Sequence, residues 1–178
     1  MSHLILVLGG ARSGKSALAE QWVEAAANAG DTLYVGTLLP GDPDSDARIA
    51  AHLSRRPASW TTTVVGADGD VAACIDAQPQ RAAVLLDGFE LALALAHPPH
   101  EEAAAAMAIG AADACRRAAA VFACVVSSEV GLGVHPETPA GIAFRDRAGA
   151  ANQALAARAD EVVLVIAGLP VWLKGAAR

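Results

Sequence analysis

The chain opens with residues whose spacing suits the binding of a phosphate chain. Residues 9–16 read GGARSGKS and fit the pattern G-x-x-x-x-G-K-[ST], which forms a loop between a strand and a helix. Its glycines let backbone N–H groups turn toward phosphate oxygens, and the positive end of the following helix lies at the same point. We expect Lys15 to contact the β and γ phosphates and the Ser16 hydroxyl to hold Mg²⁺. Lys15 and Lys174 are the only lysines in the chain, so composition alone does not explain the match, which predicts a nucleoside triphosphate site.

A second candidate for chemistry is a histidine with arginines at helical spacing around it. His52 lies in DARIAAHLSRRP, four residues after Arg48 and three and four residues before Arg55 and Arg56. A helix gathers these guanidinium groups on or beside the face that carries His52. Because nearby cations disfavour the imidazolium form, we expect a neutral ring that could attack an α-phosphorus and form a phosphoramidate. On composition alone, a solvated basic face with an incidental histidine is the better interpretation.

Other polar residues follow apolar runs that read as buried strands. Asp87 closes such a run and is the expected second ligand of Mg²⁺, directly or through water, unless it merely begins a turn. Glu129 is either a general base or the partner of a metal ligand, or an ordinary loop residue. Four residues of one late helix are candidates for phosphate binding or for ion pairs and subunit contacts: Arg145, Asp146, Asn152 and Gln153. We expect exposed loop positions for His97 and His100, and packing roles for Trp22, Trp60 and Trp172.

Strands and helices must alternate to position these groups. Apolar or β-branched runs predict strands at 4–8, 32–37, 60–65, 82–86, 121–127 and 161–167, with a short edge strand at 171–173. Helical spacing predicts helices at 15–28, 47–56, 68–77, 90–119 with an interruption at 97–100, and 140–159, with Asp44, Ser45 and Asp46 as caps of the second. The pattern indicates a three-layer α/β fold of the P-loop NTPase (RecA-like) type, with a mostly parallel sheet whose carboxyl edge carries the ligand.

Bulk composition narrows the class of protein. The 178 residues suit one domain, 1–178, and the net charge of −6 gives no electrostatic footprint for nucleic acid. No apolar stretch approaches the length of a membrane span, and the five-residue apolar run at 4–8 is too short for a signal peptide. Three cysteines in apolar surroundings indicate reduced thiols, and therefore a cytoplasmic protein.

Three later strings carry a resemblance to a known family. They are EVGLG at 129–133, FRD-x-AG-x-x-NQ at 144–153 and AGLP-x-x-LK at 167–174. Together with the glycine loop and the segment RIAAHLSRRP, they make the chain resemble the adenosylcobinamide kinase and adenosylcobinamide-phosphate guanylyltransferase family. The resemblance spans nearly the whole chain and keeps the order and spacing of the family's motifs.

This resemblance implies two reactions and a set of site residues. A hydroxyl of adenosylcobinamide takes a γ-phosphate from ATP or GTP. GTP then loads GMP onto a histidine, which falls on His52, and the phosphorylated cobinamide takes that GMP to give adenosylcobinamide-GDP. The resemblance also implies a homotrimer. The implied nucleotide contacts are Gly9, Gly10, Ala11, Arg12, Ser13, Gly14, Lys15, Ser16, Thr37, Leu38, Leu39, Leu53, Ser54, Arg55, Arg56 and Asp87.

The sequence departs from the family's pattern in several places. The family usually carries a glutamate that contacts the nucleotide near the position of Val64. After Asp87 its cysteine, threonine, tryptophan and asparagine pattern is replaced by GFELALALA, Ser128 stands where asparagine is common, and His135 stands where an apolar residue is common.

Two alternatives remain open from the sequence. One is a P-loop small-molecule kinase without the guanylyl step, and the other is a nucleotide-binding regulatory module. The latter cannot be a GTPase switch with an N-K-x-D motif, because neither lysine lies in one. For the leading interpretation we also expect the helix of His52 to move when nucleotide binds, since a proline- and aspartate-rich loop precedes it.

Overall fold

A seven-stranded sheet organises the molecule. The computed structural model describes residues 2–28, 30–38, 40–41 and 43–175, without the side chains of Asp44, Arg48, Ala51 and Arg55. The strands run in the order β3-β2-β4-β5-β1-β6-β7, and all neighbours are parallel except β7, which is antiparallel to β6. The strands are β1 (His3–Gly9), β2 (Thr32–Gly36), β3 (Thr61–Val64), β4 (Arg81–Asp87), β5 (Ala119–Ser128), β6 (Glu161–Ile166) and β7 (Leu169–Lys174).

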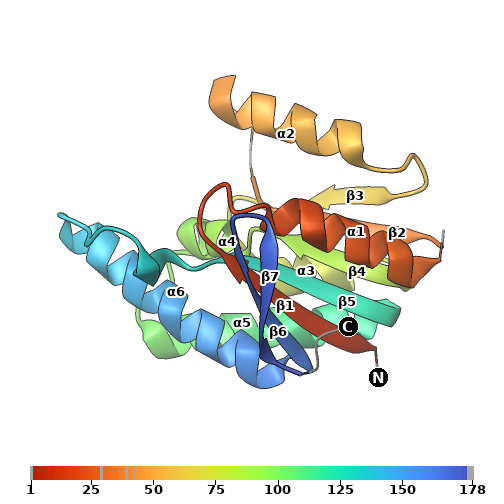
Figure 1. The fold of residues 1–178 in the computed structure, drawn as a ribbon. Coiled ribbons are helices and arrows are strands. Elements are labelled where there is room, and N and C mark those ends of the chain that lie inside the picture. Colours follow the sequence, from red (N-terminus) through yellow and green to blue (C-terminus); the bar gives the residue numbers. More distant parts are fainter. Residues whose placement is uncertain (1, 29, 39, 42, 176–178) are drawn as a thin grey trace.

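Helices cover both faces of this sheet, as the continuous apolar strands predict. The helices are α1 (Lys15–Ala27), α2 (Pro43–Arg55), α3 (Val71–Asp76), α4 (Phe89–Ala96), α5 (Glu101–Ala118) and α6 (Pro139–Arg158), with a 3₁₀ turn, η1, at Val130–Leu132. Alternate residues of β1 point to opposite faces. Leu4, Leu6 and Leu8 join the core under α3 to α6, whereas Ile5 and Val7 join a second core under α1. Figure 1 shows the resulting layers, with α2 standing above α1 and β3.

Most predicted elements are confirmed, and the second helix shows the largest difference. It begins at Pro43, four residues before the predicted start at Ala47, so the expected caps Asp44, Ser45 and Asp46 lie inside its first turn. Proline is favoured at the first helical position, and acidic residues in the first turn interact favourably with the positive end of the helix dipole. Strand β5 likewise begins at Ala119, where the sequence predicts the end of a helix.

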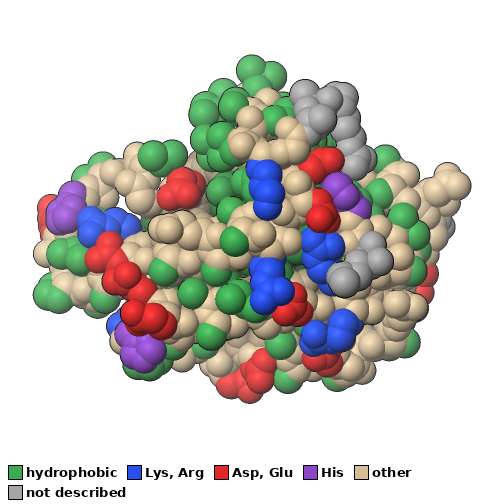
Figure 2. All heavy atoms as spheres, turned by 90° about the horizontal axis from the view of Figure 1, so that it is seen from below, with side chains coloured by type: hydrophobic (Ala, Val, Ile, Leu, Met, Phe, Trp, Pro, Cys, Tyr) green, Lys and Arg blue, Asp and Glu red, His purple; other side chains and the backbone are tan. Residues whose placement is uncertain are grey.

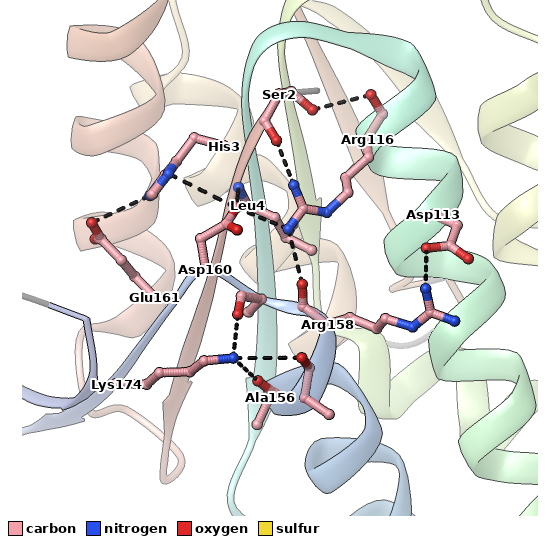
Figure 3. A network of polar contacts seen from close by, with 12 residues as sticks. Ser2, His3, Leu4, Asp113, Arg116, Ala156, Arg158, Asp160, Glu161 and Lys174 are labelled. Atoms are coloured by element: carbon pink, nitrogen blue, oxygen red, sulfur yellow. Dashed lines mark hydrogen bonds and ion pairs between the residues drawn. The ribbon is translucent and has the colours of Figure 1, made fainter.

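Hydrogen bonds and ion pairs connect the segments at the amino end of the sheet (Figure 3). The Arg116 guanidinium donates to the carbonyls of Ser2 and Arg158 and to the Asp160 carboxylate, which also accepts from the Leu4 amide. Lys174 donates to carbonyls at the end of α6, including that of Ala159 at 2.6 Å. The chain's second lysine therefore has a structural role at the end of the sheet opposite the glycine loop.

The surface carries both signs of charge. On the face seen in Figure 2, Lys and Arg side chains alternate with Asp and Glu. None of the helices in the described part of the chain has the length and apolar character to cross a bilayer.

Candidate nucleotide site and nucleophile

The glycine loop joins β1 to α1 in a conformation that its residues are suited to adopt. Gly14, which precedes α1, has φ of +93°, in the left-handed region that favours glycine. A Cβ at Gly9 would lie 2.8 Å from the Val165 carbonyl oxygen, so only glycine fits against β6 there. Arg12 also has a positive φ of 58°, which is uncommon outside glycine and typical of functional loops. The Gly168 amide, in the β6–β7 turn, donates to the Ser13 carbonyl at 2.9 Å and braces the loop from outside.

Asp87, at the carboxyl end of β4, is the centre of the polar contacts in the site. It is only 8% exposed. Its Oδ1 accepts from the Ser16 hydroxyl at 2.8 Å, and its Oδ2 accepts from the Tyr34 hydroxyl at 2.8 Å. The two groups that the sequence assigns to Mg²⁺, Ser16 and Asp87, therefore lie in contact. Hydroxyl and carboxylate oxygens are the ligands that Mg²⁺ prefers, so the donor set fits that ion.

Tyr34 supports this aspartate from the neighbouring strand. Burial, and then the negative charge of Asp87, raise the pKa of Tyr34 well above its ordinary value, and the Arg56 guanidinium acts in the opposite sense. That guanidinium lies over the tyrosine ring, with its Cζ 3.2 Å from the ring centroid. Tyr34 was not predicted as a site residue, although a lone hydroxyl-bearing aromatic inside a buried strand is a signal that a polar partner exists.

His52 lies in the same site. Its Nδ1 is 3.3 Å from Oε1 of Glu20, on α1, and 3.5 Å from Oδ2 of Asp87. The expectation that arginine guanidinium groups lie around His52 is corrected for the described side chains, because two carboxylates lie beside the ring and the guanidinium of Arg56 turns onto Tyr34. The error came from considering only the helix of the histidine, whereas the opposing face of α1 supplies Glu20.

One cleft of about 540 Å³ joins these groups. It extends from the glycine loop to α2 and β3 on one side and to α4 and the end of β5 on the other. Most of the predicted site residues line it: Ala11, Arg12, Ser13, Gly14, Lys15, Ser16, Thr37, Leu38, His52, Leu53, Arg56 and Asp87. The cleft thus brings together residues from the carboxyl ends of five parallel strands, β1 to β5, and from α2, as the rule for parallel sheets predicts.

The remaining predicted residues lie outside this lining or outside the described part of the chain. Gly9 and Gly10 precede the portion of the loop that faces the cleft. Ser54 is exposed and does not line the cleft, because successive helical residues point about 100° apart and the run 53–56 cannot share one face. Leu39 and the side chain of Arg55 lie outside the described residues.

Several cleft residues were missed. Thr62 lines it from β3, and Leu91 and Glu90 line it from the other side, beside Ser128. Val64 faces the cleft with 48% of its surface exposed, so the position where the family pattern has a glutamate does belong to the site. Glu90 follows Asp87 by three residues, which places it in the first turn of α4; that spacing was the available signal.

The other candidates have structural contacts. Glu129 precedes η1 and does not line the cleft. Arg145 pairs with Asp146 at 2.7 Å, and Asn152 accepts from the Ser127 hydroxyl at 2.8 Å. His97 and His100 are exposed, as expected, and Trp22 stacks on Trp172. Cys115 and Cys124 are buried, whereas Cys74 is half-buried, and all three are free thiols.

Comparisons with known proteins show which family the whole chain resembles. A family model described as cobinamide kinase / cobinamide phosphate guanyltransferase matches residues 5–173. The bifunctional adenosylcobalamin biosynthesis protein CobU of Salmonella typhimurium is 38% identical over 184 residues, covering 96% of this chain and 99% of the relative. The bifunctional adenosylcobalamin biosynthesis protein CobP of Pseudomonas aeruginosa is 37% identical over 179 residues, covering 96% of both chains.

Solved structures support the fold. The flagellar accessory protein FlaH of Methanocaldococcus jannaschii matches with a TM-score of 0.56 at 14% identity, covering 97% of this chain and 78% of that one. The likeness confirms the predicted α/β fold of the P-loop NTPase (RecA-like) type. With the family model spanning nearly all of the sequence and relatives matching end to end, the chain belongs to the cobinamide kinase / cobinamide phosphate guanyltransferase family.

Proposed function

We propose that this protein is a bifunctional transferase of cobalamin nucleotide-loop assembly. It phosphorylates adenosylcobinamide with ATP or GTP, and then transfers GMP from GTP, through a His52–GMP intermediate, to give adenosylcobinamide-GDP. The observation that carries the proposal is the presence of the His52 ring in one cleft with Lys15 and Ser16 of the phosphate-binding loop. The guanylyl step needs a nitrogen nucleophile in the cleft, and phosphoryl transfer to a hydroxyl does not.

The phosphate-binding loop serves both reactions. Lys15 lines the cleft from the first turn of α1, where its ammonium group would contact the β and γ phosphates. Ser16 and Asp87 would hold Mg²⁺, which when bound neutralises charge on the phosphate oxygens. The backbone N–H groups at the start of α1 bind the same anionic chain.

The position of His52 suits nucleophilic attack. When Nδ1–H donates to the Glu20 carboxylate, the lone pair of the neutral ring lies on Nε2. Nε2 then attacks the α-phosphorus of GTP, an N–P bond forms, and the bond to the bridging oxygen breaks with loss of pyrophosphate. In the second half of the reaction, a phosphate oxygen of adenosylcobinamide phosphate attacks the same phosphorus and releases the imidazole. Helix α2 carries the ring, and we expect the helix to shift toward the phosphates as nucleotide binds.

Labelling with GTP that carries radioactive phosphorus at the α position tests this function. We expect acid-labile, alkali-stable label on the wild-type chain and none on His52→Ala. His135→Ala is the matched control, because His135 is exposed and lies outside the cleft, and it should label like wild type. Label on His52→Ala would contradict the assignment of the nucleophile. A wild-type protein that takes no label but phosphorylates adenosylcobinamide would favour the kinase alone, in keeping with the apolar Val64 in the cleft.

The same proposal includes the domain organisation, the oligomeric state and the location of the protein. Following the family resemblance, we propose a single domain, 1–178, that assembles as a homotrimer in the cytoplasm. The edge strand β7 exposes Leu169, Val171 and Leu173, which supports a contact between subunits. Sedimentation velocity of the purified protein measures its mass in solution. A mass equal to that of three chains is expected, and the mass of one chain would refute the trimer.

A further inference from the structure

A second carboxylate lies in the cleft at the end away from α2. Glu90, in the first turn of α4, lines the cleft together with Leu91 and Ser128. The Ser128 amide donates to Oε2 of Glu90 at 3.1 Å, and the Ser128 hydroxyl donates to Oε1 at 2.5 Å. Two donors from one residue therefore fix the orientation of this carboxylate.

The residue that holds Glu90 is itself held beside the phosphate-binding loop. Ser128 ends β5, where it pairs with Gly9 of β1. Asn152 of α6 donates from Nδ2 to the Ser128 carbonyl at 3.1 Å. The chain of contacts from α6 through β5 to α4 places the Glu90 carboxylate at the rim of the loop that binds the phosphates, before any ligand arrives.

Among the described residues that line the cleft, the carboxylates are Asp87 and Glu90. Asp87 accepts hydrogen bonds from Ser16 and Tyr34 and is assigned to the metal ion. A carboxylate offers about four lone pairs, so Glu90 retains acceptor capacity beyond its two bonds from Ser128.

We propose that Glu90 is the general base for the acceptor hydroxyl in the phosphoryl-transfer step. This inference rests on the proposed function and names a residue that neither the sequence motifs nor the comparisons assign. The hydroxyl proton of adenosylcobinamide passes to a Glu90 oxygen as the hydroxyl oxygen forms a bond to the γ-phosphorus. The bond between the γ-phosphorus and the bridging oxygen breaks, and its electron pair leaves with the nucleoside diphosphate. The proton then passes from Glu90 to solvent.

The guanylyl step sets a different requirement. Its first nucleophile is Nε2 of His52, which carries no proton in the tautomer that donates from Nδ1 to Glu20. Its second nucleophile is a phosphate oxygen, which is already ionised near neutral pH because the second pKa of a phosphate monoester is about 6. Loss of Glu90 should therefore impair only the kinase step.

The test compares Glu90→Gln with Glu129→Gln, the same chemical change at a neighbouring carboxylate outside the cleft. Both proteins, as full chains, are assayed for phosphorylation of adenosylcobinamide and for conversion of adenosylcobinamide phosphate to adenosylcobinamide-GDP. We expect Glu90→Gln to lower kcat of phosphorylation by about 10²- to 10⁴-fold, the range for a lost general base, with KM for ATP unchanged. Guanylylation should stay within about threefold of wild type, which also shows that the variant folds. Glu129→Gln should behave as wild type in both assays.

Three other outcomes would overturn the inference. Full kinase activity in Glu90→Gln would show that no base is needed there, and an equal loss in both assays would assign Glu90 a structural role. A loss that Ser128→Ala reproduces in full would also assign a structural role, since that change keeps the carboxylate and removes one of its hydrogen bonds. Failure of the proposed function is separate, because in that case the wild-type protein itself would not phosphorylate adenosylcobinamide.

Discussion

Replacing Tyr34 by phenylalanine gives a sharp test of the buried contacts around Asp87. The Tyr34 hydroxyl donates to Oδ2 of Asp87 at 2.8 Å, and the side chain is 5% exposed. A hydrogen bond to a charged group contributes about 1.5 to 3 kcal/mol to stability. Phenylalanine keeps the ring on which Arg56 stacks, so the substitution removes the hydroxyl contact and little else. We expect the free energy of unfolding of Tyr34→Phe to be lower than that of wild type by about that amount at pH 8.

The pH dependence of this difference carries the stronger test. Burial and the charge of Asp87 raise the pKa of Tyr34 well above its ordinary 10.0. Above pH 10 the unfolded chain loses the phenol proton while the native protein keeps it. The unfolded state then binds one proton fewer, so the free energy of unfolding falls by about 1.4 kcal/mol per pH unit. The stabilisation is fully present below pH 10 and is lost above it, and Tyr34→Phe lacks this component.

The assay is urea unfolding of both proteins from pH 8 upward, followed by tryptophan fluorescence. The difference between wild type and Tyr34→Phe should be constant up to pH 10 and should pass through zero about one to two units higher, because 1.5 to 3 kcal/mol is divided by about 1.4 kcal/mol per unit. Above that pH the wild type should be the less stable of the two proteins. Tyr34 is the only tyrosine in the chain, so phenolate absorbance reports on it alone. Ionisation of the native phenol near pH 10, or a difference that does not change with pH, would refute the reasoning.

Two further predictions concern residues away from the cleft. Cys115 and Cys124 are buried, and burial raises the pKa of Cys115 to about 12 and that of Cys124 well above its ordinary value. A thiol reagent should therefore modify only half-buried Cys74 in the native protein, and fast reaction of all three cysteines before unfolding would contradict this burial. Burial acts to raise the pKa of Asp160, but hydrogen bonds from the Leu4 amide and the Arg116 guanidinium lower it below its usual 3.8. This stabilisation is present above that value and is lost as the pH falls below it, so Asp160→Asn should flatten the dependence of the urea midpoint on acid pH, and an unchanged acid profile would exclude the contact.

Local patterns were sufficient for the fold and for the loop that binds phosphate. Buried parallel strands are continuous apolar runs, and a glycine loop between a strand and a helix is a contiguous string, so both are legible along the chain. The start of α2 could not be predicted from the sequence, because a proline such as Pro43 is equally compatible with the end of a loop and with the first residue of a helix.

The contacts of the site were less predictable because they join distant segments. Glu20 precedes His52 by 32 residues and meets it only when α2 lies over α1. From the sequence alone, Glu90 in the first turn of α4 cannot be told from an acidic residue that only stabilises the positive end of the helix dipole. Its partner Ser128 lies 38 residues away, on a strand whose neighbours no local pattern specifies.

The hydrogen bond from the Gly168 amide to the Ser13 carbonyl has a consequence for the order in which parts of the protein fold during synthesis. During synthesis the glycine loop leaves the ribosome well before β6 and the turn after it, because five of the seven strands precede β6 along the chain. Domains form native contacts as their partners emerge, and pairings between distant segments are slow. The nascent chain should therefore carry an unfinished phosphate loop until the turn after β6 has emerged, so that triphosphate binding begins only after all the strands from β1 to β6 have been made.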